Sequence, residues 1–165
     1  MKSDTRILSI DIGAVGAVAV LTGDGDLVAV HDMPVLLDGP SGRRAVNGPL
    51  LAEIVANSHA SRAFVEFVGA RPKEGPVGAF AFGRSRGVVE GVCAALGLPV
   101  TFMTPPQWKR IVEIKPGKEG AKDAARAKAI ARWPSHASKF ARVKDDGRAE
   151  AALIGLAGLL KEAVK

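Results

Sequence analysis

Three carboxylate side chains stand inside apolar stretches of this sequence, where acidic residues are uncommon. Asp11 interrupts the strand-like run RILSID, Glu66 interrupts RAFVEFV, and Glu150 lies beside alanines on an apolar C-terminal segment. Carboxylates are seldom buried without a partner, although solvent exposure or a local ion pair explains any single case. Three together indicate converging oxygen ligands, which Mg²⁺ requires when it supports phosphodiester hydrolysis.

Two further acids, Asp145 and Asp146, precede Glu150. Residues four apart on a helix face the same way, so Asp146 and Glu150 project together if the helix begins at or before Asp146. Either Asp145 or Asp146 would also serve as the N-cap of that helix. We expect one of them to cap and the other to bind metal, because a cation between acids four apart offsets their repulsion.

The elements that would position these acids follow from apolar periodicity and from Gly and Pro. Strands are expected in RILSIDIGAVGAVAVL, which its glycine turn divides in two, in LVAVHDMPV from Leu27, in RAFVEFV from Arg62 and in LPVTFMTP from Leu98. Residues 38–48 are expected to form a polar loop. Helices are expected at about 50–58, 77–96, in QWKRIVEI, at about 121–131 and at about 146–161, with a loop around Trp133, Pro134 and His136.

This order predicts one α/β domain over residues 1–165, a mixed sheet flanked by helices. The first three strands would form an antiparallel meander, and the later strands would be parallel. With 165 residues and 47% hydrophobic residues, the chain is large enough to bury a core without disulfides or a structural metal.

The chain is basic, with a net charge of +6 and a pI of about 9.8, which favours a polyanionic partner. Basic residues outnumber acidic ones clearly between Lys109 and Lys144. Cys93 is the single cysteine, so an intramolecular disulfide and a thiolate metal cluster are excluded. Without a signal-peptide core or an apolar stretch of about 18 residues, the expected location is the cytoplasm, with no membrane span.

Gly83, Gly87 and Gly91 share one face of the helix expected at 77–96. Glycine weakens a helix by about 1 kcal/mol relative to alanine, so three on one face suggest close approach by another backbone. That backbone belongs either to the domain's own sheet or to the same helix of a second subunit. Spacing alone does not choose between them.

Six segments, which follow one another in the same order along the chain, resemble the RuvC-like Holliday junction resolvases of the RNase H-like superfamily, particularly their divergent bacteriophage branch. The segments are ILSIDIGAVGAVAVL, FVEFVGARP, AFAFGRSRGVVEGVCAALGLPV, TPPQWKRIV, GKEGAKDAARAKA and KDDGRAEAALIGL. The resemblance implies an RNase H-like fold and a homodimer that resolves branched DNA, in the cytoplasm of the host if a phage encodes it. The glycine-faced helix is then the candidate dimer interface.

The resemblance also implies roles for individual residues. Asp11 would bridge two Mg²⁺ ions, with Mn²⁺ as a possible substitute, and Glu66, Asp146 and Glu150 would hold them during in-line attack by a metal-bound water. This chain departs from the commonest pattern in two respects: the last acid is glutamate, and Asp146 precedes it by four residues instead of three. Asp145 therefore remains a competitor for the fourth ligand. Lys122 matches the family's catalytic lysine near the scissile phosphate, and Lys118 is a second candidate.

Phosphate contacts would select the junction by shape more than by base sequence. The candidates for these contacts are Arg71, Lys73, Arg84, Arg86, Lys109, Arg110, Lys115 and Lys118. Gly69 stands where cellular resolvases place a stacking aromatic three residues beyond the strand glutamate. Phe67 and Trp108 are expected to pack in the core, and His31, His59 and His136 receive no role.

Three alternatives stay open beside the junction resolvase. A broader nuclease would also cut flaps and forks. A non-catalytic branched-DNA-binding protein of the same fold gains nothing from clustered acids, because acids repel a polyanion. The Asp-x-Gly of Asp11 also occurs in actin-like phosphotransferases, but 165 residues do not supply their second lobe.

Overall fold

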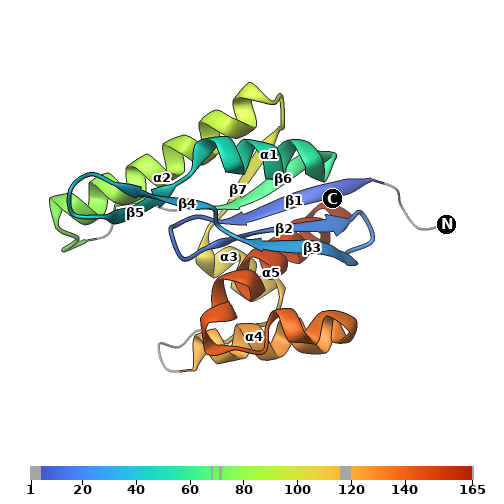
Figure 1. Ribbon diagram of the computed structural model, residues 1–165. Coiled ribbons are helices and arrows are strands. Elements are labelled where there is room, and N and C mark those ends of the chain that lie inside the picture. Colours follow the sequence, from blue (N-terminus) through green and yellow to red (C-terminus); the bar gives the residue numbers. More distant parts are fainter. Residues whose placement is uncertain (1–4, 68, 71, 116–119, 165) are drawn as a thin grey trace.

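A mixed five-stranded sheet forms the centre of the protein (Figure 1). The computed structural model describes residues 5–67, 69–70, 72–115 and 120–164, except for the side chains at 121 and 122. The sheet order is β3-β2-β1-β6-β7, with antiparallel β1–β2 and β2–β3 pairs and parallel β1–β6 and β6–β7 pairs. These strands are β1 (Arg6–Asp11), β2 (Ala17–Thr22), β3 (Leu27–Asp32), β6 (Ala60–Glu66) and β7 (Val100–Met103). The predicted mixed sheet, antiparallel first and then parallel, is confirmed.

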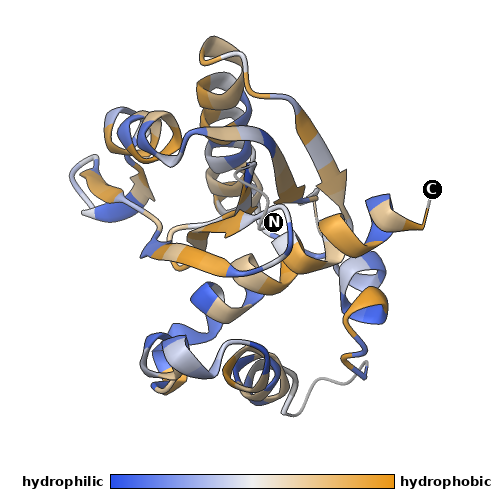
Figure 2. Cartoon of the chain, turned by 90° about the vertical axis from the view of Figure 1, so that its right-hand side faces the viewer, coloured by the Kyte–Doolittle hydropathy of each residue, from blue (hydrophilic) through white to orange (hydrophobic). Residues whose placement is uncertain are grey.

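Helices cover both faces of this sheet (Figure 1). On one face lie α1 (Gly48–Ser58) and α2 (Pro76–Ala95), and on the other α3 (Pro105–Ile111), α4 (Ala121–Arg132) and α5 (Asp146–Ala163). A hydrophobic core lies on each face of the sheet, and successive side chains along a strand point to opposite faces. Leu8 and Ile10 therefore pack toward α1 and α2, whereas Ile7 packs toward α5. Hydrophobic colouring runs along the strands and much of the last helix (Figure 2). Among the described residues, no helix is long and apolar enough to cross a membrane.

The expected loop at 38–48 is wrong, because this segment contains strands. A short hairpin pairs β4 (Val35–Asp38) with β5 (Arg43–Val46) as a separate two-stranded sheet. Gly39 and Gly42 turn the chain with φ angles of 67° and 62°, a region that glycine adopts readily. Leu37 is 74% exposed, so the hairpin lacks the clear alternation that predicts a half-buried strand.

Two element starts and the segment between α4 and α5 also differ from the sequence-based expectation. The strand β6 begins at Ala60, and α3 begins at Pro105, where proline fits the first helical turn. The Oε1 atom of Gln107 accepts a hydrogen bond from the Thr104 backbone N–H at 3.0 Å, which fixes the start of α3. Between α4 and α5 the expected loop contains the 3-10 helices η1 (Pro134–Lys139) and η2 (Val143–Asp145).

Three glycines let α5 lie directly on the sheet. A Cβ atom at Gly147 would lie 2.5 Å from the Val15 carbonyl oxygen, at Gly155 it would lie 2.6 Å from Ser9 Oγ, and at Gly158 2.3 Å from the Phe64 ring. A Cβ at Gly83, Gly87 or Gly91 of α2 would instead meet nothing within 4 Å in the described chain. The close approach within the domain therefore occurs at α5, and packing of the α2 glycines on the protein's own sheet is excluded.

Candidate metal and DNA site

Asp11 and Glu66 are the last residues of neighbouring parallel strands, β1 and β6. Because the carboxyl ends of parallel strands meet at one edge of a sheet, the two carboxylates lie together. The first turn of α5 packs against the β1–β2 turn through Gly147 and Val15. This contact brings Asp146, and Glu150 one turn later, to the same edge.

Asp11 is buried and surrounded by like charges. Burial raises the pKa of its carboxyl group well above the ordinary value, and the negative charges of Glu66 and Glu150 raise it further. A side-chain hydrogen bond with Glu66 and the charge of Asp146 act in the same direction. Burial is the largest cause of the raised pKa, and repulsion between neighbouring carboxylates adds to it, so a bound cation would be favourable at this edge.

Two neighbouring residues of α3 contact the acids from the side. Trp108 is fully buried, as expected, but its indole Nε1 also donates a hydrogen bond to Glu66 Oε1 at 3.0 Å. Lys109 Nζ lies 4.0 Å from Glu150 Oε1 and 5.2 Å from the Trp108 ring centroid. Sequence reasoning missed the role of Trp108 in orienting Glu66, because a tryptophan next to a lysine gives no signal of its distant partner.

Asp145 has a different environment from Asp146. Its side chain is 1% exposed and accepts hydrogen bonds from the Arg142 guanidinium, with an Nη2–Oδ1 distance of 2.8 Å, and from the Arg142 backbone N–H at 2.9 Å. Arg148 Nη1 lies 3.8 Å from the same Oδ1. Asp145 stands at the N-cap position of α5, as one of the two acids was expected to, but its side chain makes no capping hydrogen bond to that helix. The Asp145 carboxylate instead forms ion pairs with Arg142 and Arg148.

The donor set fits a hard divalent cation. Clustered carboxylate oxygens are the ligands that Mg²⁺ and Mn²⁺ prefer, and positive charge would relieve the repulsion that raises the pKa of Asp11. Among the described residues, however, no three Asp, Glu, His or Cys side chains are arranged closely enough to hold an ion as they stand. Trp108 and Lys109 occupy part of the carboxylate surface, through Glu66 and Glu150 respectively.

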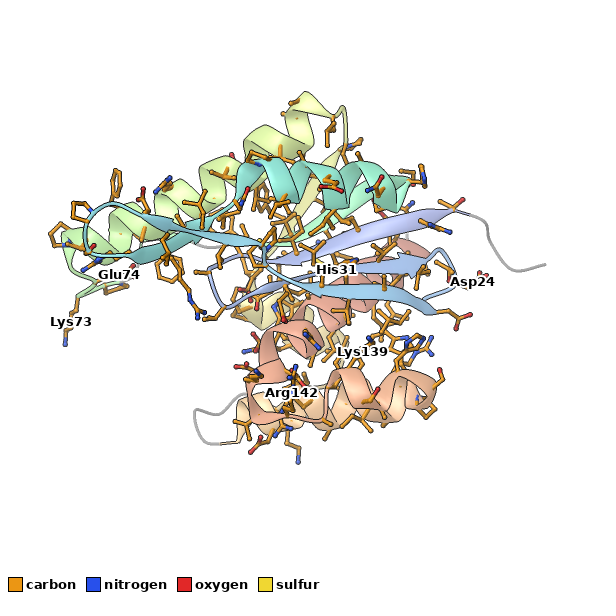
Figure 3. The ribbon with its side chains drawn as sticks, in the orientation of Figure 1. Asp24, His31, Lys73, Glu74, Lys139 and Arg142 are labelled. Carbon is orange, nitrogen blue, oxygen red and sulfur yellow. The ribbon has the colours of Figure 1, made fainter. Side chains whose placement is uncertain are left out.

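The candidate DNA-binding residues are spread over several surfaces. Lys73 points away from the body of the protein at the start of α2 (Figure 3), and Lys115 is exposed after α3. Arg84 pairs with Asp38 of the hairpin, and Arg110 lines a groove beside the end of α5. Of the remaining candidates, Arg71, Lys118 and the side chain of Lys122 lie outside the described residues.

Phe67 is not the core residue that the sequence predicted. Phe67 directly follows Glu66, and the residue is 41% exposed. The ring packs edge-on against Phe102, with centroids 6.0 Å apart, and the Arg86 guanidinium lies 4.5 Å from the Phe67 centroid. Strand β6 ends at Glu66, so strand alternation no longer determines where Phe67 points.

The sheet order and the helices on both faces match a RuvC-like, RNase H-like fold. The RuvC of Thermus thermophilus in complex with a Holliday junction substrate has a TM-score of 0.67 and 13% sequence identity, over 97% of this chain and 96% of that chain. A second T. thermophilus RuvC structure has a TM-score of 0.60 and 16% identity, with the same coverage. No protein-family model and no curated sequence matches the chain.

Proposed function

We propose that this protein is a metal-dependent endonuclease that resolves four-way DNA junctions. The observation that carries the proposal is the carboxylate cluster around Asp11 at the edge of a RuvC-like sheet. A protein of net charge +6 that binds a polyanion gains nothing from buried acids unless they hold cations. The Holliday junction bound by the T. thermophilus protein supports the choice of substrate.

In this proposal Asp11, Glu66, Asp146 and Glu150 hold Mg²⁺, for which Mn²⁺ can substitute. Bound metal would supply an activated water and neutralise charge on the phosphate. Trp108 keeps Glu66 oriented through its 3.0 Å hydrogen bond, and Lys109 places a positive charge at the edge of the cluster. Lys122 is proposed as a further catalytic cation. Asp146 is preferred to Asp145 because its charge acts on Asp11, whereas two arginines neutralise Asp145.

A cleavage assay tests the nuclease proposal. Wild type and Asp11→Asn are compared on a synthetic four-way junction, a matching duplex and a flap, with Mg²⁺, Mn²⁺ or EDTA. Metal-dependent junction cleavage by wild type alone is expected. Tight junction binding without cleavage in either metal would favour the non-catalytic DNA-binding alternative. Equal cleavage of junction and duplex would remove the resolvase assignment, and cutting of flaps would favour the broader nuclease.

Metal binding has a separate readout. Calorimetric titration with Mn²⁺ is expected to show binding to wild type and loss of that binding in Asp11→Asn. Asp24→Asn is the matched control, because Asp24 lies in the β2–β3 turn and not among the charges that act on Asp11. Equal binding by all three proteins would contradict the proposed ligand set.

We also propose a homodimer through the exposed face of α2. Gly83, Gly87 and Gly91 leave open space there, and Phe80 on the same face is 73% exposed. A two-fold dimer would present two active sites to a two-fold junction. Gly87→Arg is expected to give monomers in sedimentation equilibrium without lowering the melting temperature of the monomer. A monomeric wild type, or an unchanged dimer in the variant, would contradict this interface.

A further inference from the structure

A polar pocket of about 390 Å³ lies beside the turn that follows Asp11. Four parts of the chain form its walls: the β1–β2 turn, the end of β3, the β4–β5 hairpin and the segment that leads into α5. Its charged lining residues are Asp32, Arg44, Arg142, Lys144 and Asp145. None of its basic residues belongs to the set that the sequence predicted to contact DNA.

The two acids of this pocket are already paired. Arg148 donates to both oxygens of Asp32, at 2.6 and 2.7 Å, and Asp145 is held by Arg142. Within the described chain, the side chains of Arg44 and Lys144 have no hydrogen-bond or ion-pair partner. The lining holds three cations and two carboxylates, a net formal charge of +1, and Arg148 pairs with Asp32 from outside the lining, so the pocket favours an anion.

Arg142 is oriented for such an anion. Its Nε and Nη2 groups donate to Asp145, which uses one edge of a guanidinium that has five N–H donors. The remaining donors are available because the Arg142 side chain is 53% exposed. Arg142 lies on the side of the sheet that α4 and α5 cover (Figure 3). Arginine held in this way binds phosphate oxygens with defined geometry.

The pocket is also close to the carboxylate cluster. Its wall residue Asp145 directly precedes Asp146, so their Cα atoms are about 3.8 Å apart. The wall residues Ala14, Val15 and Gly16 follow Asp11 within the same turn. A DNA strand with one phosphate at the carboxylate cluster would therefore bring a neighbouring phosphate within reach of this pocket.

We propose that Arg44, Arg142 and Lys144 form a binding site for a backbone phosphate one or two nucleotides from the scissile one. This inference rests on the proposed nuclease function and adds a positioning site to it. The site holds the strand by its backbone and reads no base, so it fixes register without sequence preference. Asp145 contributes by fixing Arg142.

The test compares Arg44→Ala and Lys144→Ala with Arg43→Ala. Arg43 is the matched control, because it is the neighbouring residue of β5 and its side chain points to the opposite face of the hairpin. Junction affinity is measured by fluorescence anisotropy in EDTA over a series of salt concentrations. Each pocket variant is expected to bind the junction about three- to tenfold more weakly than wild type. The slope of log affinity against log salt concentration should also become smaller in magnitude by about one. Arg43→Ala should change neither quantity beyond its general charge effect.

Neutral methylphosphonates locate the contact. Placed one or two nucleotides from the cleavage point, they should weaken junction binding by wild type. They should have little further effect on junction binding by Lys144→Ala, because that variant has already lost the contact. If the pocket variants match Arg43→Ala in junction affinity and salt dependence, the inference is overturned and the nuclease proposal stays intact. If wild type binds no junction, the proposed function itself is overturned. If inorganic phosphate raised the melting temperature of wild type but not of Lys144→Ala, with junction binding equal, the pocket would bind free phosphate and the strand contact would be wrong.

Discussion

Asp145 and Asp146 are consecutive residues with different expected effects when they are neutralised. Asp145→Asn removes a buried charge that accepts hydrogen bonds from Arg142, and we expect it to lower the free energy of unfolding by about 1–3 kcal/mol. Asp146→Asn should preserve stability and abolish most junction cleavage. Urea unfolding and cleavage assays on both variants separate these effects. Loss of cleavage confined to folded Asp145→Asn would overturn our choice of ligand.

The same ion pairs predict how stability depends on pH. Hydrogen bonds from Arg142 lower the pKa of Asp145, and hydrogen bonds from Arg148 lower the pKa of Asp32, both from an ordinary value of 3.8. A lowered pKa in the folded state stabilises the protein above that ordinary value, and the stabilisation disappears as the pH falls through the folded pKa. Wild type should therefore lose stability more steeply than Asp145→Asn during acid unfolding followed by circular dichroism. Parallel curves would contradict this assignment.

At the scale of elements, the contact between α5 and the sheet fixes the position of two of the four acids. Gly158→Ala would place a Cβ atom 2.3 Å from the Phe64 ring, and we expect it to lower the free energy of unfolding by about 1–3 kcal/mol, although alanine favours helices. Chemical denaturation measures the effect. The double variant Gly158→Ala/Phe64→Leu should recover part of the loss, and an equally stable Gly158→Ala would show that α5 can shift.

The elements also show what sequence patterns can and cannot predict. Asp11 and Glu66 were recognisable because each interrupts an apolar strand, a local signal. The hairpin at 35–46 was missed because its turn glycines and exposed leucine are typical of a loop. The hydrogen bond from Trp108 to Glu66 joins residues 42 positions apart, so it depends on tertiary packing. The α2 glycines gave a correct periodicity but did not specify which surface they face.

For the whole molecule, Cys93 is a single internal probe of folding. It is fully buried on the α2 side of the sheet, and burial raises the pKa of its thiol to about 11. The thiolate is the reactive form, so native protein at pH 8 should react with Ellman's reagent far more slowly than urea-unfolded protein. The rate should follow global unfolding as urea is added. Fast reaction without denaturant would show that α2 separates readily from the sheet.

The acids of the proposed site come from the two ends and the middle of the chain, since Asp11 and Glu150 are 139 positions apart. During synthesis the ribosome releases Asp11 and Glu66 well before α5 exists. A nascent chain that stops short of Asp146 therefore carries only half of the carboxylate set, and no partial fold of it can assemble the proposed centre. Under the proposed function, DNA cutting would begin only after α5 has been translated, which protects a cell from copies of the nuclease that are truncated before Asp146.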